Sequence, residues 1–400
     1  MDVDAALELV KHGTTLLLLD VPQYTLIGVD TQMFSVGPSF KGIKMIPPGP
    51  HFVYYSSSSR DGKEFSPIIG FFVDTGPSEV IVRRWDQQEE QLVKVSEEEE
   101  ERYCQAVKSL EFDRQLGPYN LSQNGDWKQL SNYISKSIIV RFEPIGGEIS
   151  VACEPGMVNN IPKTVMEKTL DDQLEISKFS TSVNKNVNSR RCYYTSIPRF
   201  IKQKGLQGQE LTSLNLDKTQ LLETLLIKDY GGSEDVLLGE LQFAFIAFLK
   251  TMQMGQSLEA FLQWKSLVSL LFGCTKAPFH TRTRLFTKFI RVIYYQLKYG
   301  LQKDSRDTSG AVSGASALLD DSWLSADSFL YHLCKDFFSL MHDASSVDGH
   351  LLSWTRKLQE LLEKNLGWEF KPNSVVDGMH FEEDDEFAPV VEMCDDPSYN

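Results

Sequence analysis

The sequence feature that most constrains the fold is a change in hydrophobic periodicity along the 400-residue chain. In the first 95 residues, short runs of β-branched and aromatic residues are separated by Gly, Pro and Asp, which is typical of antiparallel strands. Beyond residue 210, apolar residues recur at helical spacing. The pattern predicts an α+β protein: a mainly antiparallel, sandwich-like N-terminal β domain with added helices, followed by an all-α C-terminal domain.

The β-rich part alternates incompletely between apolar and polar side chains. The run Ile68-Ile69-Gly70-Phe71-Phe72-Val73 is apolar on both faces, so we expect two packed sheets, or one sheet covered by helices. Ser96, followed by Glu97 to Glu101, predicts the N-terminal cap of a helix. Gly117-Pro118 is expected to interrupt regular secondary structure at this point in the chain. The predicted strands are 14–20, 25–29, 51–56, 67–73 and 80–85, and a second helix is predicted from about residue 126 to before residue 138.

The C-terminal helices are predicted from apolar repeats that follow polar starts. One helix begins after Ser233-Glu234-Asp235, and the next, beginning near Leu258, is apolar nearly all round. Such a helix must lie inside a bundle or an array, because it has no face to turn toward water. Gly367 suits the C-terminal cap of the last helix. Further helices are predicted at about 281–301, 327–342 and 350–365.

Length and charge divide the chain. Four hundred residues exceed what one hydrophobic core usually supports, so two domains are expected. The net charge of −15 is uneven: residues 1–150 carry −8, residues 151–369 carry +1 and residues 370–400 carry −8. The predicted division is a β-rich domain at 1–155, a basic interdomain linker at 156–210, a helical domain at 211–368 with a mobile Ser/Gly insert at 303–316, and an acidic tail at 369–400.

Several classes of function are disfavoured by composition. With 40 basic against 55 acidic side chains, the surface as a whole would repel a phosphate backbone. No apolar run approaches the roughly 18 residues of a membrane span, so we expect a soluble chain without a membrane partner. The six cysteines are scattered without a C-x-x-C pair, which suits reduced thiols. Phosphate loops, dinucleotide fingerprints and metal-ligand spacings are not found, so no cofactor and no metal site are expected.

The basic segment 176–209 holds seven cations and no Asp or Glu, and three interpretations of it stay open. Cations interleaved with aromatic rings can bind single-stranded RNA. Charged runs between domains are more often solvated linkers. The segment could also dock on an acidic partner or on the acidic N-terminal domain of this chain. The aromatic residues are Phe179, Tyr193, Tyr194 and Phe200.

The acidic tail contains a short β-prone segment between two runs of negative charge. Glu382 to Glu386 precede this segment, Phe387 to Met393, and Asp395-Asp396 follow it. Flanked by repelling charges, the segment is not expected to fold alone, but it can add itself as a strand to the edge of another protein's sheet. Pro389 limits such pairing to one side. Docking on this chain's own sheet, or no fold at all, is the competing interpretation.

Several stretches, in order along both predicted domains, resemble the A1-cistron splicing factor family, assembly factors of the U5 small nuclear ribonucleoprotein. The strongest is Gly239-Glu240-Leu241-Gln242-Phe243-Ala244-Phe245. The basic segment and the Ser/Gly insert match nothing in the family pattern, so the resemblance implies no function for them. The other matching stretches are Phe40 to Phe52, Gly70 to Phe72, Leu116 to Tyr119, Glu259 to Phe261 with Trp264-Lys265, and Phe387 to Val391.

The resemblance implies a non-enzymatic chaperone with a mostly β N-terminal domain and a helical C-terminal domain. Such a protein grips the large scaffold protein of the U5 particle and clamps its RNase-H-like and Jab/MPN-type domains. It thereby keeps the splicing helicase and RNA off a precursor particle until nuclear maturation. The chain is then expected in the cytoplasm and the nucleus, with no direct contact to nucleic acid.

Candidate partner-binding residues follow from position in the sequence. In the tail they are Phe387, Val390, Val391 and Met393, and in the strongest stretch they are the polar edge, Glu240 and Gln242. Phosphorylation near the tail or in the Ser-rich segments would add like charge and loosen strand pairing, which offers a release signal. The serines expected to be exposed are Ser305, Ser309, Ser313, Ser316 and Ser398.

An enzyme remains the competing class of function beside an RNA-binding adaptor acting through the basic segment. A hydrolase or isomerase could assemble its site only in three dimensions, and His51, Asp74 and Glu143 are its candidate residues. For His51 we expect a structural role, because Pro47-Pro48-Gly49-Pro50 fixes a turn and His51 begins the strand that follows.

Overall fold

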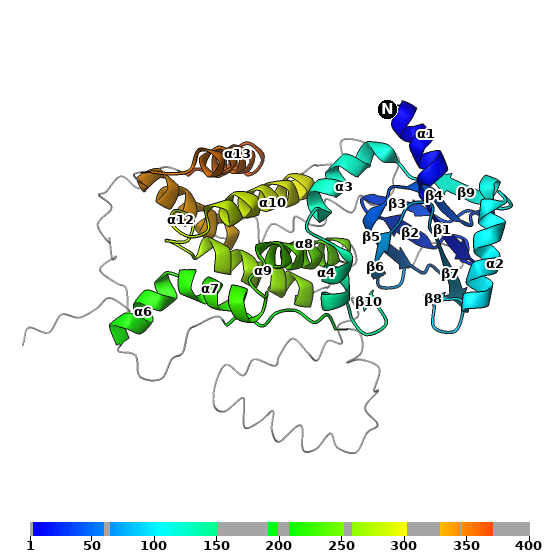
Figure 1. Ribbon diagram of the computed structural model, residues 1–400, viewed down its shortest axis with the longest axis horizontal. Coiled ribbons are helices and arrows are strands. Elements are labelled where there is room, and N and C mark those ends of the chain that lie inside the picture. Colours follow the sequence, from blue (N-terminus) through cyan, green and yellow to red (C-terminus); the bar gives the residue numbers. More distant parts are fainter. Residues whose placement is uncertain are drawn as a thin grey trace, which may run out of the picture.

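The computed structural model describes residues 3–59, 65–150, 191–198, 208–251, 258–301, 329–344 and 346–370. A β-rich part lies beside a helical part, with short helices between them (Figure 1). The strands are β1 (Thr14–Leu19), β2 (Leu26–Val29), β3 (Gln32–Ser35), β4 (Gly42–Ile46), β5 (Gly49–Ser56), β6 (Ile69–Thr75), β7 (Val80–Asp86), β8 (Gln91–Lys94), β9 (Leu116–Pro118) and β10 (Ile149–Ser150).

The strands form two five-stranded sheets within the described residues, so the prediction of two packed sheets is confirmed. The first has the order β8-β7-β1-β4-β9 and the second the order β10-β6-β5-β2-β3. Most pairings are antiparallel, but β1 pairs with β7, and β4 with β9, in parallel. Residues of both sheets share one buried cluster, in which Leu16 and Leu18 of β1 lie with Val53 and Tyr55 of β5.

The five strands predicted from β-branched and aromatic runs are all present, whereas the sequence pattern did not indicate β3, β4, β8, β9 and β10. Two of these five strands, β4 and β9, depart from a regular strand in backbone or sequence. In β4, Met45 has a positive φ of 64°, and the pairing of β4 with β1 shifts register. In β9, Gly117 and Pro118 form a short strand instead of only stopping one, because the neighbouring β4 supplies its hydrogen-bonding partner.

The helices of the N-terminal part are α1 (Val3–His12), α2 (Glu97–Lys108), α3 (Asn124–Ser131) and α4 (Lys136–Phe142). The predicted cap of α2 is confirmed, since the Ser96 hydroxyl accepts a hydrogen bond from the Glu99 backbone N–H. The single helix predicted near residues 126–138 is two helices, α3 and α4. The break is stabilised from outside, because the backbone N–H of Tyr133 donates to the side chain of Gln242 at 2.8 Å.

The helices of the C-terminal part confirm the predicted all-α domain. Gly367 ends the last helix in the left-handed conformation, with φ of 67°, as its position predicted. No helix of the described residues is long and apolar enough to cross a membrane. The helices are α6 (Gly208–Leu216), α7 (Thr219–Lys228), α8 (Glu234–Thr251), α9 (Leu258–Phe272), α10 (Thr283–Leu301), α12 (Phe329–Asp343) and α13 (Gly349–Leu366).

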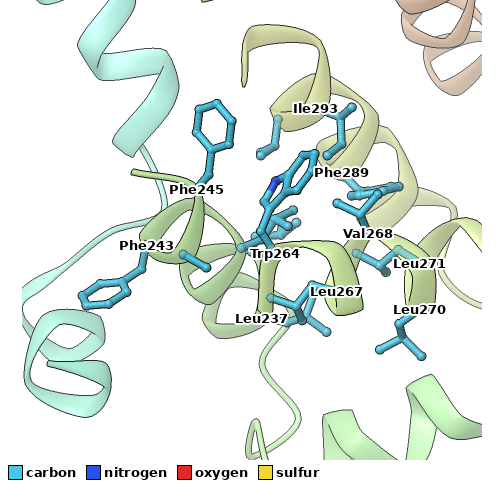
Figure 2. Packing of buried hydrophobic residues seen from close by; sticks show 14 of the residues in the cluster. Leu237, Phe243, Phe245, Trp264, Leu267, Val268, Leu270, Leu271, Phe289 and Ile293 are labelled. Carbon is cyan, nitrogen blue, oxygen red and sulfur yellow. The ribbon is translucent and has the colours of Figure 1, made fainter. Parts of the chain in front are cut away.

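Helix α8 joins the two parts through one continuous hydrophobic core. Phe243 stacks on Phe72 of β6 at 4.5 Å between ring centroids, and it lies 6.0 Å from Phe142 of α4. Phe245, two residues on, faces Trp264 of α9. Figure 2 shows Phe243 and Phe245 pointing in different directions from α8, with Trp264 among apolar side chains of the helical part. The N-terminal and C-terminal domains are therefore packed as one body.

The close approach of α8 to the break between α3 and α4 predicts the effect of a single methyl group. A Cβ on Gly239 would lie 2.8 Å from the Tyr133 carbonyl oxygen and 2.9 Å from Ile138 Cγ1. We expect Gly239→Ala to lower the free energy of unfolding by about 1–3 kcal/mol, although alanine favours helices. Chemical denaturation measures the change.

The matched control is Gly300→Ala in α10, where a new Cβ would meet nothing within 4 Å. This variant should be neutral or more stable by up to about 1 kcal/mol. Equal effects at the two positions would show that helix propensity, and not the contact between the domains, governs Gly239.

Candidate protein-interaction site

The tail residues predicted to bind a partner, Phe387, Val390, Val391 and Met393, lie outside the described residues. The same is true of the Ser/Gly insert and of much of the basic segment. The serines predicted as regulatory sites that lie outside the described residues are Ser305, Ser309, Ser313, Ser316 and Ser398.

Glu240, the first predicted helical contact residue, lies inside the molecule with 0% of its surface exposed. Its carboxylate accepts three hydrogen bonds: from the Thr195 backbone N–H at 2.7 Å, from the Tyr230 hydroxyl at 2.7 Å and from the Gln263 amide at 2.8 Å. Burial raises the pKa of the Glu240 carboxyl, and the hydrogen bonds offset this rise only in part. The residue connects α8 to the turn after α7, to α9 and to the segment around Thr195.

Gln242, the second predicted contact residue, is also 0% exposed. Its carbonyl oxygen accepts from the Tyr133 N–H, and its amide group donates to the Gln129 carbonyl oxygen at 3.2 Å and to Asn132 Oδ1 at 2.7 Å. These partners belong to α3 and the break after it. The structure therefore corrects the expectation that Glu240 and Gln242 face a partner: both connect parts of this chain, because α8 is covered on every side.

The described part of the basic segment, residues 191–198, is packed at its centre. Thr195 is buried, and Tyr194 lies edge-on to Phe243 of α8 at 6.1 Å. Tyr194 is therefore not available to stack on a base, whereas Tyr193 is 56% exposed. The solvated-linker interpretation does not describe this stretch, which forms part of the core between the domains. Phe179 and Phe200 lie outside the described residues.

A second buried polar network surrounds His51, within the stretch that carries the family resemblance. His51 is 2% exposed and Asp30 is 0% exposed. The imidazole Nδ1 lies 2.6 Å from Asp30 Oδ2, and Nε2 lies 2.6 Å from the Pro47 carbonyl oxygen. Asp30 also accepts from the Tyr119 hydroxyl at 2.7 Å and from the Phe52 backbone N–H at 2.9 Å. The network ties β2 and β5 to the turn before β5 and to the residue after β9.

Both ring nitrogens of His51 face atoms that only accept hydrogen bonds, so a protonated ring satisfies both. Burial lowers the pKa of His51, but the charge and hydrogen bond of Asp30, together with the Pro47 hydrogen bond and the charge of Asp74, outweigh it and place the pKa above its usual value of 6.5. The predicted structural role of His51 agrees with this geometry. Asp30 was missed, because 21 residues separate it from His51 and only the pairing of β2 with β5 brings them together.

The structure brings two of the three residues proposed for a hydrolase near each other, since the charge of Asp74 helps to raise the pKa of His51, but it does not join them into an open site. His51 is enclosed with both nitrogens engaged, whereas Asp74 is exposed on β6. Glu143 lies at the end of α4, where burial raises the pKa of its carboxyl. No group of three or more His, Cys, Asp or Glu suited to a metal ion occurs among the described residues.

Two surface cavities are lined by residues that the sequence did not single out. One, of about 300 Å³, lies between α7 and α9 and includes Lys218 and Lys265. The other, of about 340 Å³, lies between α1, β4 and the end of α2, with Val10 and Leu110 exposed beside it. Neither contains His51, Glu143, Glu240 or Gln242.

The Glu240 cluster yields a prediction with a pH dependence. Replacement by alanine removes the acceptor of the buried Thr195 N–H and of the Tyr230 hydroxyl, whereas the Gln263 amide keeps the Thr195 carbonyl oxygen. We therefore expect Glu240→Ala to lower the free energy of unfolding by about 3 kcal/mol. Glu240→Gln keeps an acceptor for Thr195 and Gln263, and its amide can donate to the Tyr230 hydroxyl, so it should cost much less.

The pKa of Glu240 is higher in the folded chain than its unfolded value of 4.5. The folded state therefore binds more protons, and the stabilisation is present below pH 4.5 and lost as pH rises through the folded pKa. Compared with Glu240→Gln, the parent chain should become less stable over that range in denaturation experiments at several pH values. A stability difference that does not change with pH would contradict the assignment.

Comparison with known proteins covers both parts of the chain. Residues 12–144 match the family model of the AAR2 N-terminal domain, and residues 194–371 match the model of the AAR2 C-terminal repeat region. The chain is 29% identical to the human protein AAR2 homolog over 98% of this chain and 96% of the relative. It is 27% identical to the Caenorhabditis elegans protein AAR2 homolog over 90% of this chain and 95% of that relative.

A more distant relative is the A1 cistron-splicing factor AAR2 of Saccharomyces cerevisiae, 22% identical over 71% of this chain and 76% of the relative. The matches run through the sheets, through the His51 network and through α8 with its buried polar residues. The chain belongs to the AAR2 family.

Proposed function

We propose that this chain is a non-enzymatic splicing factor that acts as an assembly chaperone of the U5 small nuclear ribonucleoprotein. It binds the large scaffold protein of that particle through the RNase-H-like and Jab/MPN-type domains and delays binding of the helicase and of RNA. It works in the cytoplasm and the nucleus. The observation that carries the proposal is membership of the AAR2 family over both domains, since the yeast relative is named as a splicing factor.

The packing of the two domains supports a role in gripping a partner. Domains joined by a linker move relative to each other unless their interface is large and hydrophobic. Here Phe72 of the β domain stacks on Phe243 of the helical domain, and Gln242 adds three hydrogen bonds across the same interface. A frame that is already rigid loses little conformational entropy when it binds two domains of a partner at once.

The buried polar groups also favour binding over catalysis. His51 and Glu240 carry shifted pKa values, which often mark active sites. Both are saturated by partners within the chain, and neither lines the two cavities described above. Their role is to orient strands and helices, which is what a binding scaffold requires.

The β-prone segment of the tail supplies the strand in this proposal. Its backbone groups would pair with a sheet edge of the scaffold, and its alternate side chains would set specificity. The charges at Glu382 to Glu386 would favour a basic surface beside that edge. Phosphorylation in the tail or the Ser-rich segments would release the complex by like-charge repulsion.

Deletion of residues 381–400 should weaken binding to the purified RNase-H-like and Jab/MPN-type domains at least tenfold, or about 1.4 kcal/mol. Isothermal titration calorimetry measures the affinity. Two variants of the full chain separate the causes of the loss. Serine at Phe387, Val390, Val391 and Met393 removes the strand's side chains and keeps the charge, whereas glutamine at Glu382 to Glu386 removes charge and keeps the strand.

Strand addition requires the serine variant to lose most of the affinity and the glutamine variant to lose less. Unchanged affinity after the deletion would remove the tail from the proposal. Failure of the intact chain to bind these domains would overturn the proposed function itself.

Release by phosphorylation has a separate test in the full-length chain. Ser398→Asp adds charge beside the β-prone segment, and we expect it to lower the affinity for the same domains several-fold. Ser398→Asn is the matched control, because it has similar size without charge. If both variants bind as tightly as the parent, charge at Ser398 is not the release signal.

A further inference from the structure

Helix α10 presents a stripe of positive charge on the face opposite its buried one. Arg284, Lys288, Arg291 and Lys298 are spaced four, three and seven residues apart, so they fall within an arc of about 80° around the helix axis. The opposite face is buried, with Phe286, Phe289 and Ile293 among its residues. All 19 residues of α10 lack Asp and Glu. The stripe is about 21 Å long, at 1.5 Å per residue.

Helix α13 packs along α10 and extends this charge sideways (Figure 1). Two cations lie over the ring of Trp354: Lys357 Nζ is 4.5 Å from its centroid and the Arg291 guanidinium is 5.6 Å from it. Tyr294 and Tyr295 pack against the same indole at 5.6 and 6.0 Å. These contacts hold the cations in place on an aromatic base. We name Arg284, Lys288, Arg291, Lys298 and Lys357 the cationic face.

Little of this charge is neutralised by the described part of the chain. Lys288 forms an ion pair with Asp235 at 2.8 Å. Arg291 donates to the uncharged amide oxygen of Gln129 at 3.0 Å. Among the described residues, no carboxylate lies within ion-pair distance of Arg284, Arg291, Lys298 or Lys357. Four of these five cations therefore have no carboxylate partner among the described residues, and they can face a negatively charged ligand.

We propose that the cationic face binds the acidic run Glu382 to Glu386 of the same chain. Charge complementarity supports this occupant, because residues 370–400 hold nine acidic side chains and one basic side chain. Length also matches, since five extended residues span about 17 Å, within the length of the stripe.

The packing of Phe370 places the acidic run within reach of the cationic face. The described chain ends at Phe370, whose ring packs against Tyr331 at 5.5 Å and Phe338 at 4.8 Å on α12. Twelve residues lead from Phe370 to Glu382, enough to span up to about 40 Å when extended. Along α13, Lys357 is only about 14 Å from Leu366.

Tethering decides whether such a contact forms. Exposed ion pairs are weak one by one and are screened by salt. A short flexible tether, however, gives an effective concentration on the order of millimolar, so several weak pairs together can hold the tail. In the free chain, the β-prone segment that follows the acidic run would then lie against the molecule's own surface. A partner would have to displace this segment from the surface. Until then, the contact would keep the segment from pairing with the sheet edges of other proteins.

Zero-length carbodiimide cross-linking of the full-length chain, read by mass spectrometry, tests the contact without any partner. At low salt, about 50 mM, we expect amide links from Lys357, Lys288 or Lys298 to residues 382–386, and their loss at about 500 mM. Lys364 is the internal control, because it is exposed on the same helix and closer to Phe370 in sequence. Links to Lys364 that equal or exceed those to Lys357 would reflect random collisions and overturn the proposal.

Charge reversal provides the matched pair of variants. Arg291→Glu should reduce the Lys357 links several-fold, whereas Lys108→Glu, the same change of net charge on exposed Lys108 of α2, should leave them unchanged. Circular dichroism checks that both variants fold. Equal effects would contradict the proposal.

A single-stranded RNA oligonucleotide is titrated in parallel. Suppose that no tail links form, that the parent chain binds the RNA and that Arg291→Glu abolishes this binding. The cationic face would then be assigned to RNA instead of the tail. Because no scaffold is present, failure here leaves the proposed function untouched.

Discussion

The burial of α8 is the constraint on which the rest of the structure depends. From Leu237 to Leu249 its side chains are almost fully enclosed, so the helix needs apolar neighbours on every side. Helices α9 and α10 provide some of them, and β6 with α4 provides the others. The β domain is therefore one wall of the core that the helical domain requires. Burial of this kind is the largest favourable term in folding, and here it fixes the arrangement of the domains.

Polar groups inside this core give the packing its specificity. Apolar contact alone would tolerate small shifts of α8 along its neighbours, but Gln242 satisfies backbone groups at the break between α3 and α4 only in one position. Glu240 does the same for Tyr230 and the segment around Thr195. A buried group that loses its partner costs far more than a net hydrogen bond contributes, so these contacts select one arrangement. The Asp30–His51 pair has this role between the strands.

The molecule thus combines two closely packed domains with strongly charged stretches of sequence. Its net charge of −15 is unevenly distributed: cations line the exposed side of α10, and acidic residues are concentrated in the tail sequence. Under the two proposals above, this separation would let the acidic run pair either with the cationic face of its own chain or with a basic surface of the partner. The AAR2 family, and the splicing role proposed here, fit a protein whose chemistry is recognition.

By itself, the sequence determined the local features. The periodicity placed five strands, the helices α8, α9, α10, α12 and α13, and the caps at Ser96 and Gly367, because helix and strand patterns depend on a few neighbouring residues; it did not indicate α6 and α7. Matching stretches also determined the family. Only the tertiary structure decided that Glu240 and Gln242 face inward, that Tyr194 belongs to the core, and that Asp30 pairs with His51. The reason is physical: whether a polar side chain is buried or exposed depends on the elements that pack over it, and those come from positions far away in the chain.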